Sequence, residues 1–387
     1  MVATLPFSIL VIARDEAHTL PLLAGSLRAF LSAGAELVVI DTGSSDDTAR
    51  VAREFGARVE SVAGRFHSTL SEEQAAAIEA RFARGGEAPL VEAGQLLFDY
   101  ASARQFASER ASNDFVWHVD ASDVVLAADL EFLASAVRGG RAHSFDYFLE
   151  VERSRFRVWR FFDRRQFAWR GRVHERPFRS KPEASGERVS CSPAQLSLRH
   201  SHGEKTRNYL AGLALQVMED GATPRWRHFL GRQLLYERRY RSAIGVLREH
   251  ARMSGATPEE RARSLEMAGE CWEALERPQG AAACYLKALR IDLSRRTPLL
   301  RLGRLFQARG DFQRSVACAA AALMLPRSNA FVDENENDPA DPHALLYWGL
   351  FWLGRRDEAR AHWETCRRLA PDNAKFEEDG RLFAGRS

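Results

Sequence analysis

Residues 115–126, FVWHVDASDVVL, place a run of strand-forming apolar residues directly before two aspartates that stand three positions apart, Asp120 and Asp123. In α/β sheets, ligands bind beyond the carboxyl ends of the strands. Two carboxylates at such an end can hold Mg²⁺ or Mn²⁺, hard cations that bridge diphosphate oxygens. The plainer interpretation is that Asp120 ends a strand and Asp123 caps a helix formed by VVLAADLEFLASAV. Both interpretations fit this spacing.

The residues before this stretch alternate between strand and helix patterns. Strands are predicted at 7–13, 36–41 and 58–62, and amphipathic helices at 17–31 and 46–56. This alternation requires crossover connections and therefore a largely parallel sheet that is covered on both faces. We expect an α/β fold in which the loops after Ala13, Asp41 and Val119 converge on one crevice.

Asp41 resembles Asp120 in its position, because it ends the strand ELVVID and runs into TGSSDDT. A carboxylate beside such a glycine-containing turn can accept hydrogen bonds from a nucleobase or a ribose. The plainer interpretation is that Asp41 ends the strand, while Ser44 or Ser45 caps a helix that begins near Asp46.

A long segment, residues 64–94, interrupts the alternating pattern after the third predicted strand. Connections of this length are usually functional lids or insertions. We expect a helix from Ser71 to Arg84, with Ser71 as its cap and Gln74 in its first turn. Because the insertion follows the third strand near the predicted crevice, we also expect it to influence access of a substrate to that crevice.

From about residue 223 onward the chain reads as successive helices with internal similarity. Gly231, Gly269 and Gly303 each precede a small residue by twelve positions, and the glycines are 38 and 34 residues apart. This resembles the tetratricopeptide repeat, whose period is ~34 residues. We predict four imperfect repeats that form a helical solenoid and a surface for a protein partner or a homodimer; the alternative is a plain helical bundle.

Composition is that of an ordinary globular chain. Of 387 residues, 45% are hydrophobic and 28% are charged, and the net charge is +3. The five cysteines are widely spaced, which favours reduced thiols in a cytoplasmic protein. The apolar run at 7–13 is too short for a signal core or a membrane span, so we expect no transmembrane segment and at most peripheral contact with the inner membrane.

Arginines alternate with aromatic residues between Arg153 and Arg172. Such interleaving can indicate nucleic-acid binding. A period of two is more simply explained by antiparallel strands with one buried face. We therefore expect strands here and no nucleic-acid partner.

Taken together, the motifs VIARDEAHTL, VVIDTGSSDDTARVAREFGARV, FDYASARQFA, FVWHVDASDVVL, WRGRVHE and KTRNYLAGL resemble the family 2 glycosyltransferases of the GT-A fold. The chain is similar in particular to bacterial members with tetratricopeptide repeats behind the catalytic domain, among them peptide and glycan glycosyltransferases. The resemblance implies a GT-A, Rossmann-like mixed sheet at 1–205 with the insertion at 64–94, a linker helix at 206–222, and repeats at 223–387.

The resemblance also assigns residues to a donor site. Asp41 matches the aspartate that holds the nucleotide base, and the loop formed by Arg14, Asp15 and Glu16 lies against it. Arg104 matches an arginine that faces the nucleotide, although Gln105 replaces the asparagine of the family. Asp120 matches the first carboxylate of the D-A-D-E motif. Here that motif reads D-A-S-D, so Ser122 replaces the second metal carboxylate.

The remaining assignments concern the metal and the acceptor. The metal, Mn²⁺ or Mg²⁺, is expected on Asp120 and Asp123, with His200 and His202 where the family often carries a histidine. Lys205 and Arg207 either meet phosphate or form a solvated helix face. In WRGRVHE, Glu175 matches the acceptor side and is the candidate general base, with His174 as its orienting group or substitute. The alternative is that Glu175 only pairs with a neighbouring arginine.

The expected activity is transfer of a sugar, with inversion, from a nucleoside-diphosphate sugar to a hydroxyl or thiol of a peptide, glycan or lipid-linked glycan. The alternative is a catalytically weakened scaffold that binds a nucleotide sugar and recruits a partner through its repeats; Ser122 favours it. A nucleotidyltransferase is a third class, disfavoured because the first loop, ARDEAHT, is not a glycine-rich phosphate loop.

Overall fold

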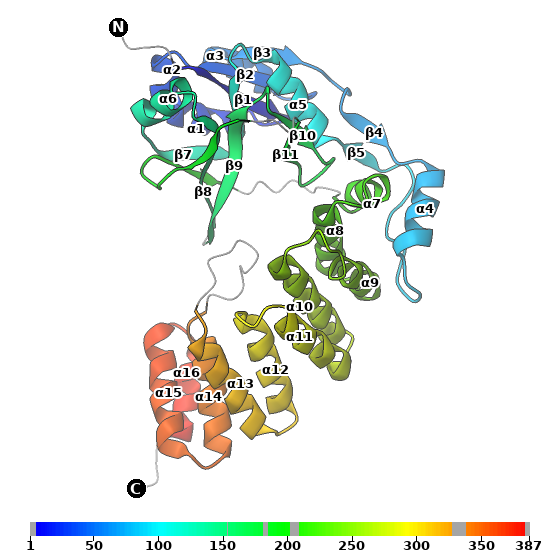
Figure 1. The fold of residues 1–387 in the computed structure, drawn as a ribbon, viewed down its shortest axis with the longest axis vertical. Coiled ribbons are helices and arrows are strands. Elements are labelled where there is room, and N and C mark those ends of the chain that lie inside the picture. Colours follow the sequence, from blue (N-terminus) through cyan, green and yellow to red (C-terminus); the bar gives the residue numbers. More distant parts are fainter. Residues whose placement is uncertain (1–4, 153, 181–184, 202–208, 327–337, 384–387) are drawn as a thin grey trace. The chain divides into compact units, whose positions relative to one another are not determined.

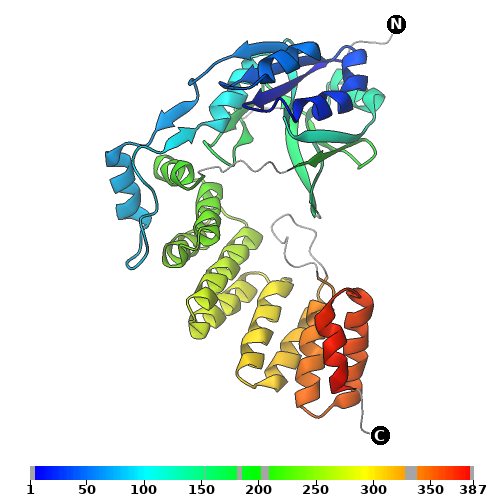
Figure 2. The same ribbon diagram turned by 180° about the vertical axis from the view of Figure 1, so that it is seen from behind.

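The computed structural model describes residues 5–152, 154–180, 185–201, 209–326 and 338–383, arranged in two compact units (Figures 1 and 2). The first unit comprises residues 1–79 and 91–219, and the second comprises residues 80–90 and 220–387. The expected residues His202, Lys205 and Arg207 lie outside the described ranges.

The first unit is built on a mixed sheet in the order β3-β2-β1-β6-β9-β8-β13-β7, with β12 paired to β8. Its strands are β1 (Phe7–Ala13), β2 (Glu36–Asp41), β3 (Arg58–Ser61), β6 (Phe115–Asp120), β7 (Asp123–Ala128), β8 (Ala142–Val151), β9 (Ser154–Asp163), β12 (Glu187–Ser190) and β13 (Leu196–His200). The pairs β1–β2, β1–β6 and β2–β3 are parallel, whereas β9 is antiparallel to β6 and β8. The sequence therefore predicted the parallel half and the antiparallel arginine-rich strand correctly.

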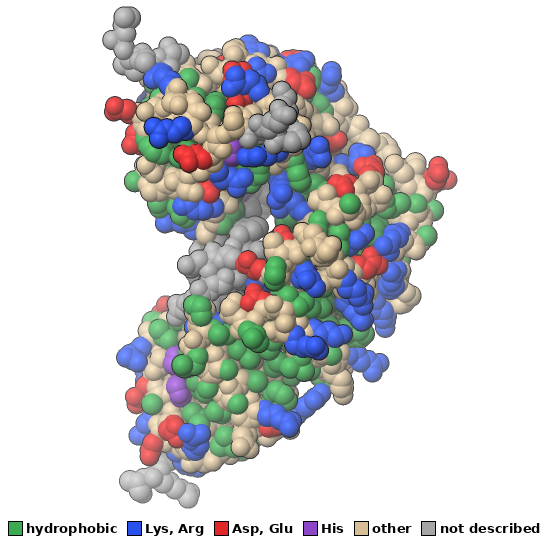
Figure 3. All heavy atoms as spheres, viewed as in Figure 1, with side chains coloured by type: hydrophobic (Ala, Val, Ile, Leu, Met, Phe, Trp, Pro, Cys, Tyr) green, Lys and Arg blue, Asp and Glu red, His purple; other side chains and the backbone are tan. Residues whose placement is uncertain are grey.

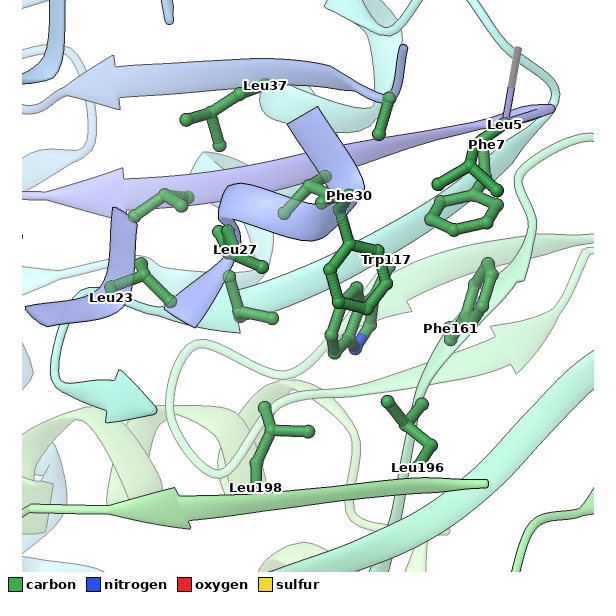
Figure 4. Packing of buried hydrophobic residues seen from close by; sticks show 14 of the residues in the cluster. Leu5, Phe7, Leu23, Leu27, Phe30, Leu37, Trp117, Phe161, Leu196 and Leu198 are labelled. Atoms are coloured by element: carbon green, nitrogen blue, oxygen red, sulfur yellow. The ribbon is translucent and has the colours of Figure 1, made fainter. Parts of the chain in front are cut away.

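Helices and two small hairpins complete this unit, although the last residues of α4 group with the second unit. The helices are α1 (Leu20–Ser26), α2 (Arg28–Ser32), α3 (Thr48–Glu54), α4 (Glu72–Phe82), α5 (Tyr100–Arg110), α6 (Leu130–Arg138) and α7 (Tyr209–Glu219). The hairpins are β4 (His67–Thr69) with β5 (Leu96–Phe98), and β10 (Phe167–Arg170) with β11 (Arg176–Arg179). The main hydrophobic core lies between the sheet and the segment α1–α2: Trp117 is fully buried, with its ring 5.3 Å from that of Phe30 and 6.0 Å from that of Phe161 (Figure 4).

The parallel register brings three strand ends together. Ala13 pairs with Asp41, and Ile12 pairs with Asp120. The loops after β1, β2 and β6 therefore start side by side, as the alternating pattern predicted.

Two expectations about helix starts are wrong. Neither Ser44 nor Ser45 caps α3, which begins at Thr48; instead Asp46 accepts a hydrogen bond from the Thr48 backbone N–H at 2.9 Å. Asp123 does not cap a helix either, because residues 123–128 form β7. The cap of α6 is Asp129, which accepts from the Phe132 N–H at 2.9 Å.

The insertion contains the expected helix α4, one or two residues shorter at each end. Ser71 and Gln74 exchange hydrogen bonds of 3.0 and 3.1 Å between side chain and backbone, which is the predicted capping arrangement. Residues 80–90 group with the second unit, where Glu87 accepts hydrogen bonds from the N–H and hydroxyl of Ser242 and Arg81 pairs with Glu249. The insertion is thus divided between the two units.

Helix α7 occupies the described part of the expected linker helix, and it packs within the first unit. The Gln216 side chain accepts from the Arg172 N–H at 3.0 Å, and Arg172 forms an ion pair with Glu219 at 2.7 Å. The first unit consequently extends to Glu219.

The second unit consists of antiparallel helix pairs, which is a helical-repeat arrangement (Figure 1). The pairs are α8 (Pro224–Tyr236) with α9 (Tyr240–His250), α10 (Pro258–Ala274) with α11 (Pro278–Ile291), α12 (Arg296–Ala308) with α13 (Phe312–Met324), and α14 (Asp341–Trp352) with α15 (Arg356–Leu369); α16 (Ala374–Glu378) follows. At Gly231 and Gly269 an added Cβ would clash with Leu247 and Tyr285 of the paired helix. The small residues at the repeated positions thus permit close helix packing. Within the described residues, no helix is both long and apolar enough to cross a membrane.

Candidate functional site

A cluster of charged side chains lies beyond the carboxyl end of β6. Its members come from separate elements: Asp120 from the end of β6, Arg104 from α5, Arg160 from β9, Glu175 from the turn between β10 and β11, Asp123 from the start of β7, and His200 from the end of β13. The mixed sheet and the α5 helix therefore bring together residues that are up to 96 positions apart in the sequence, from Arg104 to His200.

Arg104 lies at the centre of this cluster. Its Nη2 donates to Oδ1 of Asp120 at 2.6 Å, and its Nε donates to Oε1 of Glu175 at 2.7 Å. The guanidinium group also stacks over Trp169, 5.1 Å from the ring centroid, and the side chain is only 4% exposed. One buried cation thus holds two carboxylates from distant segments.

The third nitrogen of this guanidinium group is Nη1. Among the described residues, no hydrogen-bond partner lies near Nη1 of Arg104, although this atom is buried. A buried donor without a partner is costly in a folded protein and is common where a ligand supplies the acceptor. Arg104 can therefore donate to an anion without giving up either of its present partners.

Asp120 is held as a carboxylate by two arginines. Its Oδ2 accepts from Nη1 of Arg160 at 2.6 Å, opposite the bond from Arg104. Burial alone would raise the pKa of Asp120, but the charges of Arg160 and Arg104 outweigh burial and hold the pKa well below its usual value. Asp120 consequently carries its negative charge at neutral pH.

Asp123 and His200 form the second half of the cluster. Oδ1 of Asp123 lies 2.7 Å from Nδ1 of His200, and Oδ2 accepts from the Asp120 N–H at 2.8 Å. Burial and the charge of Asp120 raise the pKa of Asp123. Burial lowers the pKa of His200, but the hydrogen bond to Asp123 and the two aspartate charges raise it overall. The contact between Asp123 and His200 therefore depends on the protonation of these two groups, and it lies beside the ionised Asp120.

The predicted metal ligands Asp120, Asp123 and His200 come together, with one ligand atom of each within 4.8 Å of the others. Two carboxylates and an imidazole are suitable ligands for Mn²⁺ or Mg²⁺, with water completing the shell. Ser122 adds no charge to this group: its Oγ is 3.5 Å from Nδ1 of His200, and its carbonyl accepts from the Ser201 N–H at 3.1 Å. The residues present fit a divalent cation with fewer anionic ligands than D-A-D-E would provide.

Asp41 belongs to a separate group, formed by the loops after β1 and β2. Its Oδ1 accepts from the N–H groups of Gly43 and Ser44 at 3.2 and 2.9 Å, and its Oδ2 accepts from the Ser61 hydroxyl at 3.0 Å. Burial would raise the pKa of Asp41, but these hydrogen bonds lower it overall. In this structure Asp41 therefore closes the turn after β2, and a nucleobase would have to share or replace these bonds.

The segment Arg14–Glu16 is tied to the same turn. Asp15, with a φ of 52°, accepts from the Ser45 N–H at 2.7 Å and donates its own N–H to the Ser44 hydroxyl at 2.9 Å. The Glu16 N–H donates to the Thr48 hydroxyl at 2.7 Å. Nη1 of Arg14 lies 2.7 Å from Nε2 of His67, at the start of the insertion. Hydrogen bonds thus join the loop after β1 to the loop after β2, next to the end of β1.

The two predicted acceptor-side residues differ in their surroundings. Glu175 reaches the charged cluster through Arg104, and its side chain is 11% exposed. His174 adopts a φ of 51°, and its ring centroid lies 5.3 Å from that of Tyr209 in α7. Glu175 is therefore the better placed of the two to meet a substrate beside Asp120.

Arg160 and His118 were not predicted from the sequence. Arg160 follows Phe156 and Val158 and precedes Phe162 at intervals of two, so a charge in a row of apolar residues was the available signal. His118 is fully buried and its pKa is well below the usual value, chiefly because of burial. The neutral imidazole Nε2 accepts from the Trp169 indole at 3.1 Å and lies 2.8 Å from the Ser108 hydroxyl, which contacts the Arg104 carbonyl. It thereby supports both Trp169 and the helix that carries Arg104.

No known family model matches the chain, and a search of curated proteins also finds no match. Similar solved structures include MamA, with 13% identity over 43% of this chain and 84% of that chain at a TM-score of 0.34. PilF of Pseudomonas aeruginosa has 18% identity over 44% and 71% of the two chains at 0.37. YrrB, described as a tetratricopeptide-repeat protein with an unusual peptide-binding site, has 15% identity over 44% and 81% at 0.34. Scores this low carry no conclusion about the activity of this chain.

Proposed function

We propose that the protein is an inverting, metal-assisted glycosyltransferase that uses a nucleoside-diphosphate sugar as its donor. The proposal rests on one observation, the convergence of Arg104, Asp120 and Glu175 with the pair Asp123–His200 at the carboxyl end of β6. Sheets of this kind bind nucleotides at this edge. The cluster also offers both charges that such a donor requires, cationic groups for the diphosphate and carboxylates for a cation.

The positively charged groups would stabilise the negative charge of the leaving diphosphate. Nη1 of Arg104 is a buried donor that has no partner among the described residues, and Arg160 is a second cation on the other side of Asp120. Fixed cationic donors in a site of low dielectric stabilise a developing negative charge without reorganisation. Asp120, Asp123 and His200 would hold Mn²⁺ or Mg²⁺, and the ion would supply further neutralisation of that charge.

Glu175 is the proposed general base. Arg104 occupies its Oε1, and no hydrogen bond within the described residues engages Oε2. That oxygen can accept the proton of an acceptor hydroxyl or thiol as it attacks the sugar carbon, while the diphosphate leaves from the opposite face. Asp41 and the loop Arg14–Glu16 are proposed to meet the base and ribose.

The test is release of nucleoside diphosphate from a panel of nucleotide sugars by the purified full chain in the presence of Mn²⁺. We expect turnover with one donor, its loss in Asp120→Ala, and a fall of about 100-fold or more in Glu175→Gln with unchanged affinity for the nucleotide. Glu54→Gln, an exposed position on α3, is the matched control and should retain full turnover. Equal turnover in Glu175→Gln and the parent would refute the role of Glu175.

A second candidate function is a scaffold that binds a nucleotide sugar without turning it over and recruits a partner through its helical pairs. Ser122 favours it, because a neutral hydroxyl replaces an anionic metal ligand. Nucleotide binding by a folded parent without turnover of any donor would support the scaffold.

The acceptor of the proposed transfer reaction is a peptide, a glycan or a lipid-linked glycan.

A further inference from the structure

The last helix pair carries two histidines that face each other. Nδ1 of His343 on α14 lies 2.8 Å from Nδ1 of His362 on α15, and the ring centroids are 5.1 Å apart. Both side chains are half-buried, and Figure 3 shows histidine side chains in purple at the surface of the helical unit. Neither histidine has a part in the proposed transfer reaction.

We propose that His343 and His362 bind Zn²⁺ or a similar divalent ion that prefers imidazole ligands, and that this ion would link α14 to α15. Two imidazole nitrogens on a tetrahedral Zn²⁺, at ~2.0–2.1 Å each, lie ~3.3 Å apart. The observed separation needs to grow by only a few tenths of an ångström. The two nitrogens are therefore close to the spacing that such an ion requires, and each ring would have to turn so that its Nδ1 lone pair points to the ion.

The protonation states of the two rings are compatible with a metal. A contact between two Nδ1 atoms at 2.8 Å requires one ring to donate an N–H to the lone pair of the other. Burial lowers the pKa of both histidines, and for His343 the charges of His362 and Arg368 act in the same direction. Both rings are therefore neutral at pH 7, and the donor ring needs only to move its proton to Nε2 to expose a second lone pair.

Glu358 is a candidate for a third ligand. It precedes His362 by four residues on α15, so the two side chains lie on the same face of the helix. The charge of Glu358 raises the pKa of His362. In the structure Glu358 forms an exposed ion pair with Arg355 at 2.7 Å. An exposed pair of this kind is weak and exchanges readily. Rotation of this carboxylate toward the ion would give a set of two histidines and one glutamate, with water in the fourth position.

The chemistry of this pair differs from that of the cluster at Asp120. Imidazole ligands suit Zn²⁺, Cu²⁺ and Ni²⁺, whereas carboxylate-rich sites suit Mg²⁺ and Mn²⁺. The pair should therefore bind Zn²⁺ in the presence of millimolar Mg²⁺.

The test is calorimetric titration of the full chain with Zn²⁺ in excess Mg²⁺, in the parent, His343→Gln and His362→Gln. Because the Asp120 group can also take Zn²⁺, the readout is stoichiometry: each variant should bind one equivalent fewer than the parent and lose the rise in Tm that Zn²⁺ gives the helical unit. His18→Gln, at an exposed position in the first unit, should match the parent. Equal stoichiometry in the parent and both variants would overturn the proposal.

Two further measurements complete the test. Glu358→Gln should weaken Zn²⁺ binding at this site about tenfold, and an unchanged affinity would remove Glu358 from the ligand set. If the glutamine variants fail to fold, NMR of the parent decides the question. Zn²⁺ must then shift the imidazole signals of both His343 and His362, and unshifted signals would refute the site.

Discussion

Nε of Arg104 lies 2.7 Å from Oε1 of Glu175, so the residue proposed to bind the diphosphate also fixes the residue proposed to act as base. The same guanidinium group holds Asp120 at 2.6 Å. In the proposed reaction, positioning of the donor, the cation and the acceptor would thus depend on one buried side chain of α5.

Replacement of Arg104 by Met should reduce both stability and nucleotide binding. Removing one partner of a buried ion pair leaves uncompensated charge, here on Asp120 and Glu175, and costs about 3 kcal/mol. Urea unfolding and calorimetric nucleotide binding measure the two effects. Arg104→Lys is the matched variant: it keeps the charge but not the paired geometry, so it should recover most of the stability and little of the binding. Full nucleotide affinity in Arg104→Met would contradict the assignment.

Ser122→Asp should strengthen metal binding. A carboxylate at this position would add an anionic ligand beside Asp120 and His200, and ligand charge is a main determinant of affinity for hard cations. We expect Mn²⁺ affinity to rise at least about tenfold, measured by calorimetry, whereas Ser122→Asn should leave it close to that of the parent. If Ser122→Asp and Ser122→Asn bind Mn²⁺ equally, the cation does not sit at this strand end.

The buried pair Glu266–Arg295 in the helical unit should be important for stability. Glu266 is 0% exposed and Arg295 is 4% exposed, and the guanidinium donates from Nη2 to Oε2 at 3.0 Å. Glu266→Gln should lower the free energy of unfolding by about 3 kcal/mol. The exposed pair Arg355–Glu358 provides the control, since Arg355→Gln should cost less than about 1 kcal/mol. Urea titrations of the three proteins at pH 7 compare these values, and similar losses in both variants would be evidence against the burial argument.

Stability of the helical unit should fall in mild acid because of His250. This side chain is fully buried between α9 and α10, its Nδ1 lies 2.8 Å from the Ser264 hydroxyl, and burial lowers its pKa from 6.5 to about 4. The unfolded chain therefore binds a proton at intermediate pH that the folded chain does not. Stability should be complete above pH ~6.5 and decline by up to about 3 kcal/mol as the pH falls to 4.

Hydrogen exchange of amides in α9 and α10 at pH 7 and pH 4.5 measures this decline. His250→Phe, which cannot take up the proton, should show a smaller decline than the parent, whereas His18→Gln should behave like the parent. Identical declines in His250→Phe and the parent would show that other groups control the transition.

The parallel half of the sheet was predictable because β1, β2 and β6 are apolar runs separated by amphipathic segments, which is a local pattern. The position of Asp123 at the start of a strand was not predictable, because the short apolar run VVLAA fits a strand as well as a helix. Only the pairing of β7 with β13 decides between the two. Of the site, Asp120, Arg104 and Glu175 could be named from motifs. Arg160 could not, because it reaches Asp120 through the antiparallel pairing of β9 with β6, a contact between segments 40 residues apart.

The most direct test of the central claim is calorimetric binding of UDP, GDP, CDP and dTDP to the full chain, each with and without Mn²⁺, in the parent and in Asp120→Asn. We predict that one nucleotide binds, that Mn²⁺ strengthens its binding, and that the strengthening disappears in Asp120→Asn. Absence of binding by every nucleotide, or a Mn²⁺ effect that persists in Asp120→Asn, would contradict a metal-assisted donor site at the end of β6.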